Sequence, residues 1–518
     1  MKTLVMRRGI GGVVGVLAAA LVVSGCTGGG GGEPGPTATA GASSGTGVAA
    51  LAPGVAGFDD VYGQSVAWGE CAPLDAKVQA AFDAAGRSRD DRECARVSVP
   101  LDWDDPADSA RIELAVVRYP ATGPASERLG SLLVNPGGPG GDGQSLAARL
   151  AAEPRADHLS AAYDLVGMDP RGIGQSSPID CVADDDVKPD TVLFAECLRD
   201  NPLTHHMGTS SVAKDLDAVR VLVGDAQLNY LGYSYGTALG ATYASLFPQL
   251  VGRMVLDSAI DATWSGPINA FDQTQAIERA SAELGASCGV TNTTAFPCAW
   301  ADEEQLQALR DRLTETPWVA SDGTEVGDSF FDGYLTTTNY KVNAERAHRL
   351  ELIAGAASGD QASIDAIAAD HASSSVGLAG SIVGCFSRPV HPDLLALYDH
   401  VLEVTGDQDR AADEVSDLGT DCSLLEEEGT DFTESFDATG SAPILVIGVT
   451  GDHATPYDKA VSLVAQLGTA ELLSLEANQH GASYLKQNAS CIDAYTDAYL
   501  LRGELPPADT LCQLDGAP

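Results

Sequence analysis

The stretch Leu228-Asn-Tyr-Leu-Gly-Tyr-Ser-Tyr-Gly236 decides the fold of this chain. Its first four residues form the short apolar run of a buried strand, and residues 237–247 have the apolar spacing of a helix. The two glycines let a strand and a helix approach each other at a sharp turn, and Ser234 stands at the apex of that turn. This is the context of a nucleophile elbow, so Ser234 is the candidate nucleophile. An ordinary strand-to-helix turn is the alternative.

Strands and helices alternate on both sides of the elbow, which predicts an α/β fold with a mostly parallel sheet. We expect two early, antiparallel strands at 97–101 and 111–119. Later strands are expected at 131–135, 163–168, 253–256, 444–449 and 471–475, with helices at 211–223 and 459–467. The stretch 261–440 is mostly helical, acidic and rich in loops. The simplest account is a sheet domain in two parts, 58–260 and 441–518, separated by a helical cap.

A serine nucleophile needs a general base, and the base needs an orienting acid. With such an elbow, the acid and then the histidine follow the serine along the chain. His480 lies in a short loop after a strand and is the candidate base, whereas His453 adjoins the best acid and would point elsewhere. Asp452, just past the strand 444–449, is the candidate acid. Asp257, at the end of an earlier strand, is its competitor, with a cap or a loop hydrogen bond as its other role.

The oxyanion of an acyl-transfer reaction needs backbone N–H donors. Asn135-Pro-Gly-Gly-Pro-Gly-Gly141 follows a strand, and its glycines permit a close backbone approach. Proline has no N–H, so we expect Gly138 to be one donor and Tyr235, after the nucleophile, to be the other. A phosphate-binding loop is the rival, but this stretch lacks the Gly-Lys-Ser/Thr ending of a P-loop. The motif at 169–176 is expected to brace the loops around the elbow.

The N-terminus is typical of a bacterial export signal. Three basic residues precede an uncharged apolar stretch at 9–25, which is short and glycine-rich for a membrane anchor. It ends in Val23-Ser-Gly-Cys26, which looks like a lipobox, where a peptidase cleaves before a cysteine that carries lipid. We therefore expect a signal peptide at 1–25, lipid on Cys26, a flexible tether at 26–57 and a place on the outer face of the cell membrane. Ordinary secretion is the alternative.

The chain has 11 cysteines, an odd number that is awkward for an exported protein. Lipidation of Cys26 would leave ten, an even number for an oxidising compartment. Sequence alone cannot select a connectivity, but pairing near neighbours keeps each bridge inside one segment. The expected pairs are Cys71–Cys94, Cys181–Cys197, Cys288–Cys298, Cys385–Cys422 and Cys491–Cys512. No Cys-x-x-Cys or His-Glu-x-x-His spacing occurs, so we expect neither a metal nor a cofactor.

The charge balance excludes one class of partner. Asp and Glu number 73 against 30 Lys and Arg, for a net charge of −43. A field of this sign repels phosphate backbones, so no nucleic-acid partner is expected. Two interpretations stay open: a merely solvated acidic surface, or acids gathered near a site for cationic groups.

Taken in this order, the motifs resemble those of the α/β-hydrolase superfamily, and more closely the exported tripeptidyl aminopeptidases of actinobacteria, relatives of the proline iminopeptidases. The resemblance runs from about residue 65 to the end. It is carried by Asn135-Pro-Gly-Gly-Pro-Gly140, Asp169-Pro-Arg-Gly-Ile-Gly-Gln-Ser176, Gly232-Tyr-Ser-Tyr-Gly236, Gly451-Asp-His-Ala-Thr-Pro456 and His480-Gly481. It implies Ser234, Asp452 and His480 as nucleophile, acid and base. It also implies release of short N-terminal peptides, from substrates with a free N-terminus, through a covalent serine ester under a helical lid.

The sequence departs from the family pattern at three places. His453 replaces a proline that often follows the acid, and Asn478-Gln479 stands where a glycine is common before the histidine. Asp142 follows the glycine loop where a small serine is usual, and we expect it to alter the pocket rim. A carboxylesterase or lipase-like hydrolase is the alternative function, because the same triad cleaves esters. A lipid-anchored binding protein with a degenerate elbow is a third hypothesis.

Overall fold

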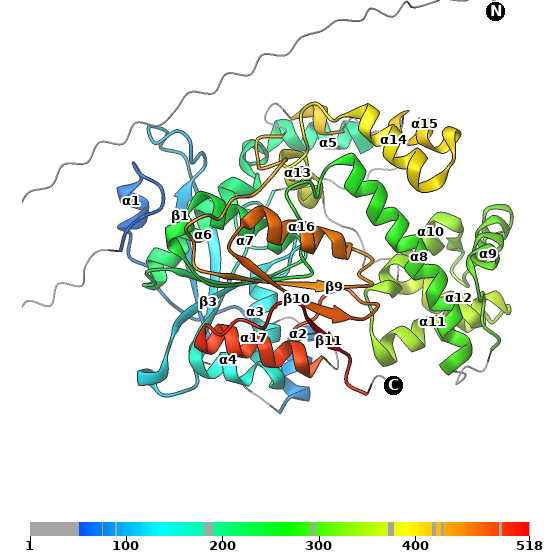
Figure 1. Ribbon diagram of the computed structural model, residues 1–518, viewed down its shortest axis with the longest axis horizontal. Coiled ribbons are helices and arrows are strands. Elements are labelled where there is room, and N and C mark those ends of the chain that lie inside the picture. The colour runs from blue at the N-terminus through cyan, green and yellow to red at the C-terminus, as the bar shows by residue number, and fades with distance from the viewer. Residues whose placement is uncertain are drawn as a thin grey trace, which may run out of the picture. The chain divides into compact units, whose positions relative to one another are not determined.

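A computed structural model describes residues 51–74, 76–86, 88, 91–179, 181, 190–291, 296–370, 378–416, 421–425, 429–485 and 489–516. Within them, nine strands form one sheet in the order β1-β2-β4-β3-β5-β6-β9-β10-β11 (Figure 1). The strands are β1 (Glu93–Pro100), β2 (Arg111–Tyr119), β3 (Gly130–Asn135), β4 (Tyr163–Met168), β5 (Leu228–Tyr233), β6 (Val251–Asp257), β9 (Ile444–Val449), β10 (Ala470–Glu476) and β11 (Thr510–Gln513). β2 runs antiparallel to both neighbours and the remaining pairs are parallel. The predicted α/β fold and the antiparallel early strands are confirmed. β11 has no counterpart in the sequence prediction.

Helices cover both faces of this sheet, which explains why the central strands are apolar throughout. Every residue of β3, β4 and β9 is buried, as in parallel strands packed on both sides. One apolar cluster joins the sheet to α1 (Asp59–Tyr62), α5 (Asp190–Asp200), α6 (Thr209–Val223), α7 (Tyr235–Leu246) and α16 (Tyr457–Leu467). The other joins it to α2 (Ala76–Ala84), α3 (Gly143–Ala152), α4 (Asp157–Ala162) and α17 (Ser490–Arg502).

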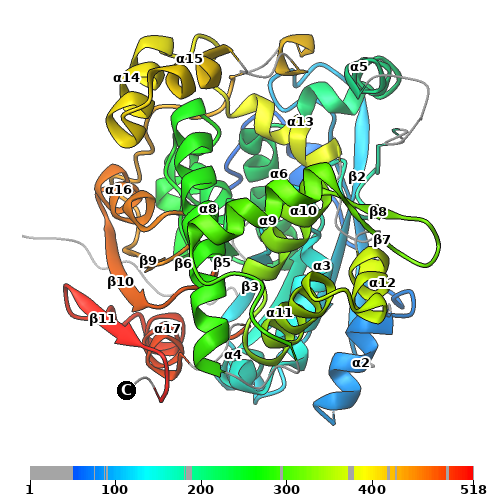
Figure 2. The ribbon, with the colours of Figure 1, turned by 90° about the vertical axis from the view of Figure 1, so that its right-hand side faces the viewer.

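Along the chain, a group of helices lies between the neighbouring strands β6 and β9, within the stretch 261–440 for which the sequence predicts a cap. They are α8 (Pro267–Thr291), α9 (Glu303–Glu315), α10 (Asp328–Asn339), α11 (Asn343–Ala357), α12 (Gln361–Asp370), α13 (Leu378–Phe386), α14 (Leu394–Thr405) and α15 (Gln408–Ser416), with a short hairpin of β7 (Trp318–Val319) and β8 (Glu325–Val326). Figures 1 and 2 show α14 and α15 at one end of α8 and α9 to α12 at the other. Each group has its own small apolar core, whereas α13 packs into the apolar cluster that joins the sheet to α6 and α7.

The segment before α1 is bound to the core, which corrects the predicted tether. The amide of Gly54 donates to Asp217 Oδ2 at 2.6 Å, and Arg220 donates to the carbonyl of Ala52 at 2.8 Å. The prediction of a free tether over 26–57 is therefore wrong from residue 51 onward, because the composition is flexible but buried charges on α6 bind its backbone. The rest of the tether, the signal peptide and Cys26 lie outside the described residues.

Four of the predicted disulfides are present in the structure. They are Cys71–Cys94, Cys181–Cys197, Cys385–Cys422 and Cys491–Cys512. Cys298 is also disulfide-bonded, but the side chain of Cys288 lies outside the described residues, so that pairing stays a prediction. In the part of the chain that the structure describes, we find no helix long and apolar enough to span a membrane.

Candidate active site

Ser234 occupies a strained turn between β5 and α7. Its φ and ψ are 56° and −128°, a left-handed conformation that costs about 1–3 kcal/mol and is found where the surroundings impose it. The glycines on either side are required by space, because a Cβ on Gly232 would lie 2.5 Å from the carbonyl oxygen of Gly236. The amide of Ser234 donates to the carbonyl of Asp257 at 2.9 Å. The predicted strand–turn–helix geometry is thus present at Ser234.

His480 and Asp452 form a buried pair. His480 Nδ1 lies 2.9 Å and 3.0 Å from the two carboxylate oxygens of Asp452, which also accepts the amides of Ala454 and Thr455 at 2.9 Å. Burial alone raises the pKa of Asp452, but the charges and hydrogen bonds of His480, with smaller effects of His453 and the Thr455 amide, outweigh it and lower the pKa to about 2. Asp452 is therefore ionised near neutral pH, and its hydrogen bond to Nδ1 leaves His480 Nε2 for proton transfer.

Asp257, the competing acid, binds the histidine loop instead of the histidine ring. Its carboxylate accepts the amides of Ala482 and Ser483 at 3.0 Å and 2.7 Å, and the Ser483 hydroxyl at 2.5 Å. Its side chain is fully buried. Of the two roles left open by the sequence, the structure supports the loop hydrogen bond.

The glycine loop after β3 lies directly against the elbow. A Cβ on Gly137 would lie 2.9 Å from Ser234 Cβ and 3.0 Å from the amide nitrogen of Tyr235, so only glycine fits. The Gly137 amide already donates to Asn135 Oδ1 at 2.9 Å. The next amide, that of Gly138, and the amide of Tyr235 stay the predicted oxyanion donors.

Two residues of the cap reach this site, and sequence reasoning missed both. The Tyr340 ring, at the end of α10, packs edge-on against the rings of His480 and His453, with centroids 5.4 Å and 4.7 Å apart. On α13, Gly380 lies so near the glycine loop that a Cβ on Gly140 would be 3.5 Å from its Cα. Neither residue belongs to a local motif, and only the cap's tertiary packing brings it here.

The departures from the family pattern have definite contacts. Asn478 donates to Glu283 of α8 at 3.0 Å, and its carbonyl accepts from Arg346 of α11 at 3.3 Å, so it links the histidine loop to the cap. Asp142 caps α3 by accepting the Ser145 amide at 2.7 Å, and it lines a cavity of about 650 Å³ beside β1 and β2. The His480–Asp452 pair forms despite these changes.

The motif at 169–176 is structural, as expected. Asp169 accepts the amide of Gln175 at 2.9 Å and the side chain of Gln144 at 2.7 Å, which ties this loop to the start of α3. Arg171 forms a fully buried ion pair with Asp215 of α6 at 2.6 Å. These contacts brace the loops beside the elbow without touching Ser234.

A second cavity, of about 390 Å³, lies between α8 and the loop that carries the candidate acid. Its charged lining residues are Arg279 and Glu283 from the cap and Asp452 and Asp458 from the core. Among the described residues, no group of three or more His, Cys, Asp or Glu side chains is arranged to hold a metal ion. The charges beside the candidate site are thus mostly negative.

A serine at a strand-to-helix elbow, with a His–Asp pair on later loops of the same sheet, defines a serine hydrolase of the α/β type. Residues 130–281 match the family model described as alpha/beta hydrolase fold, and residues 409–512 match that of TAP-like protein. The chain belongs to the α/β hydrolases, in the group of the tripeptidyl aminopeptidases.

Three relatives illustrate the range of this group. The chain is 31% identical over 505 residues to the serine protease Hip1 of Mycobacterium tuberculosis, covering 87% of this chain and 91% of that protein. It is 30% identical over 482 residues to the tripeptidyl aminopeptidase of Streptomyces lividans, covering 82% and 84%. It is 31% identical over 468 residues to carboxylesterase B of M. tuberculosis, covering 81% and 86%.

Proposed function

We propose that this protein is an exported, lipid-anchored aminopeptidase that releases short, tripeptide-type N-terminal peptides through an acyl-serine intermediate. The observation that carries the proposal is the buried His480–Asp452 pair in a chain whose Ser234 occupies a nucleophile elbow. Relatives named tripeptidyl aminopeptidase and serine protease, each aligned over most of the chain, support the peptidase assignment.

In the proposed reaction, Ser234 Oγ attacks the scissile carbonyl carbon while His480 Nε2 takes its proton. Asp452 holds the Nδ1–H and stabilises the imidazolium that forms. The amides of Gly138 and Tyr235 bind the oxyanion. His480 then gives the proton to the leaving amine, and water attacks the serine ester by the same route, which releases the short peptide.

The cap is the element that makes the enzyme an exopeptidase in this scheme. Tyr340 lies beside the ring of His480, and Gly380 of α13 lies beside the glycine loop that carries a proposed oxyanion donor. A peptide chain running past the nucleophile in both directions would meet these elements. The carboxylates around the neighbouring cavity favour a cationic substrate N-terminus.

The test compares a free tripeptidyl anilide with its N-acetylated form. We expect cleavage of the free peptide only, and equal rates on both would contradict the aminopeptidase proposal. Ser234→Ala serves as the inactive control, and a fluorophosphonate probe should label Ser234 in the wild-type protein. A panel of dipeptidyl and tripeptidyl fluorogenic substrates then defines the length preference.

A carboxylesterase is the second candidate, favoured by the relative named carboxylesterase B. The same nucleophile and base serve esters and amides. This candidate predicts a kcat/KM for short-chain aryl esters that far exceeds that for any peptide anilide and does not depend on a free amine.

The lipid anchor is a proposal of its own, based on Val23-Ser-Gly-Cys26. It predicts a mature chain that begins at Cys26 with a diacylglycerol thioether and lies on the outer face of the cell membrane. Mass spectrometry of the mature N-terminal peptide checks this. An unmodified Cys26, or cleavage elsewhere, would contradict the anchor and leave the peptidase proposal untouched.

A further inference from the structure

The last residue of β6 and the three residues that follow it contact the elbow of Ser234, the loop of His480 and the strand β9 that leads to Asp452. These residues, 257–260, are called here the segment after β6; they lead into the cap, and all four are buried. The pattern of its hydrogen bonds shows what fixes the nucleophile and the base relative to each other.

The segment holds the nucleophile elbow through its backbone. The carbonyl of Asp257 accepts the amide of Ser234 at 2.9 Å. Three residues further on, the amide of Ile260 donates to Thr237 Oγ1 at 3.1 Å, and that hydroxyl donates to the carbonyl of Ser234 at 2.6 Å. Both backbone groups of Ser234 are therefore tied to this segment.

The same segment holds the histidine loop through its side chains. The carboxylate of Asp257 accepts two amides and a hydroxyl from residues 482–483, and Ser258 Oγ accepts the amide of Gly481 at 2.7 Å. The three residues that follow His480 are thus each bound. Ser258 has a φ of 55°, an uncommon conformation for a residue other than glycine. In this conformation its hydroxyl lies within hydrogen-bonding distance of the loop.

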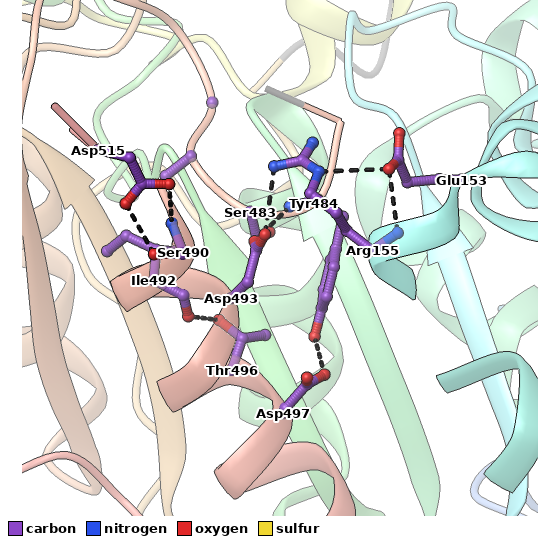
Figure 3. A network of polar contacts seen from close by, with 12 residues as sticks. Glu153, Arg155, Ser483, Tyr484, Ser490, Ile492, Asp493, Thr496, Asp497 and Asp515 are labelled. Atoms are coloured by element: carbon purple, nitrogen blue, oxygen red, sulfur yellow. Dashed lines mark hydrogen bonds and ion pairs between the residues drawn. The ribbon is translucent and has the colours of Figure 1, made fainter. Parts of the chain in front are cut away.

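Two further contacts complete the frame. The amide of Ala259 donates to the carbonyl of Ile447 on β9, the strand that leads to Asp452, at 3.3 Å. Figure 3 shows the far side of the histidine loop, where the Tyr484 amide and hydroxyl donate to Asp493 and Asp497 of α17 at 2.7 Å and 2.8 Å. The loop is fixed on one side by α17 and on the other by the segment after β6.

We propose that Asp257 and Ser258 are positioning residues for the hydrolytic reaction, because they hold the loop of His480 against the same backbone that holds Ser234. The inference rests on the function proposed above. Neither residue touches the proposed reacting groups with its side chain, so each acts through the distance and angle between Ser234 and His480. Misplacement of reacting groups by about 1 Å costs on the order of 100-fold in rate.

The decisive variant is Asp257→Asn. The amide keeps the shape of the side chain but has one acceptor oxygen fewer, so at least one of the loop donors loses its partner. At pH 8 we expect kcat to fall ~10- to 100-fold while KM stays within about twofold, because the substrate-binding surface is unchanged. The rate of Ser234 labelling by a fluorophosphonate should fall with kcat.

Two further variants separate positioning from stability. Ser258→Gly suits the positive φ and removes only the acceptor of the Gly481 amide, so it should lower kcat in a folded protein. Asp225→Asn is the control, because Asp225 is a half-buried carboxylate that likewise accepts a backbone amide, that of Ser131 at 2.8 Å, at the opposite end of β3. It should change the unfolding temperature and leave kcat unchanged.

The outcomes separate this inference from the proposed function. Wild-type kcat in both folded variants, Asp257→Asn and Ser258→Gly, would overturn the positioning role. The same kcat loss in Asp225→Asn would also overturn it, since the effect would then be general destabilisation. Wild-type protein that fails to label at Ser234 would overturn the proposed function and this inference together.

Discussion

Ser234 and Ser258 both have a left-handed backbone, with φ of 56° and 55°, although neither is a glycine. Each such residue costs about 1–3 kcal/mol and persists only where the surroundings determine it. Both are held by hydrogen bonds that cross from one loop of the site to another. In this part of the fold, the strained backbone is therefore found at two residues whose side-chain direction matters for the proposed reaction.

Asp452 gives the first residue-scale prediction. Replacement by Asn leaves the shape of the site but removes the charge that stabilises a His480 imidazolium, so Asp452→Asn should lower kcat roughly 10³- to 10⁴-fold. Steady-state kinetics on the peptide anilide, with Asp437→Asn as an exposed control, measures this. If the variant kept most of its activity, the assignment of Asp452 as the acid would be wrong.

Asp257 gives a prediction about pH. Burial raises its pKa to about 6 from an ordinary value of 3.8, and its hydrogen bonds to residues 482–483 and the charge of His480 only partly oppose this. Compared with the unfolded chain, the folded protein therefore binds a proton more tightly at the Asp257 carboxyl. The stabilisation this provides is complete below pH 3.8 and is lost as the pH rises through 6, by roughly 3 kcal/mol in total.

The check compares urea unfolding of the wild-type protein with that of Asp257→Asn between pH 4 and 7. Both proteins keep His480 and Tyr233, the titratable neighbours, so the difference reports on Asp257. The free energy of unfolding of the wild-type protein should fall relative to the variant across this range. A constant difference would show that burial does not shift the pKa of this carboxyl.

At the scale of elements, the sequence predicts those parts of the site that have a local signature. The elbow at Ser234, the glycine loop at Asn135 and the loop of Asp452 each follow a buried strand. Their position at the carboxyl ends of the strands could therefore be inferred. The contacts of Tyr340 and of the segment after β6 could not. They depend on how loops hundreds of residues apart pack, which no local pattern encodes.

The turn after α10 supports a prediction about the cap. The Tyr340 ring packs edge-on against the ring of His480, and Arg346 holds the turn by donating to the carbonyl of Asn339 at 2.9 Å. Tyr340→Ala should lower kcat/KM about tenfold, whereas Tyr340→Phe, which keeps the ring, should stay within about threefold of wild type. Equal kinetics for the Ala variant and the wild-type protein would show that the cap does not act on the histidine.

At the scale of the whole molecule, buried ion pairs on α6 explain how an acidic chain packs its charges. Arg171 pairs with Asp215, and Arg220 pairs with Asp217, with all four side chains fully buried. Arg171 also donates to the carbonyl of Leu101 in the loop between β1 and β2, and Arg220 donates to the carbonyl of Ala52 in the N-terminal segment. The composition alone does not predict these ion pairs, because it counts Lys and Arg without showing which acid each one contacts.

Residues 51–57 should therefore contribute to stability, although their composition is that of a linker. A chain that begins at Phe58 loses the Gly54 amide and the Ala52 carbonyl that satisfy Asp217 and Arg220, and leaving buried charged groups short of a partner costs ~1–3 kcal/mol each. A chain that begins at Leu51 keeps both contacts and is the matched control. Urea unfolding should show a loss of at least ~1 kcal/mol in the shorter chain only, with kcat unchanged in both because the two contacts that are lost are made with α6 and not with the triad. Equal stability of the two chains would mean that water replaces these contacts, and the segment would then be part of the tether after all.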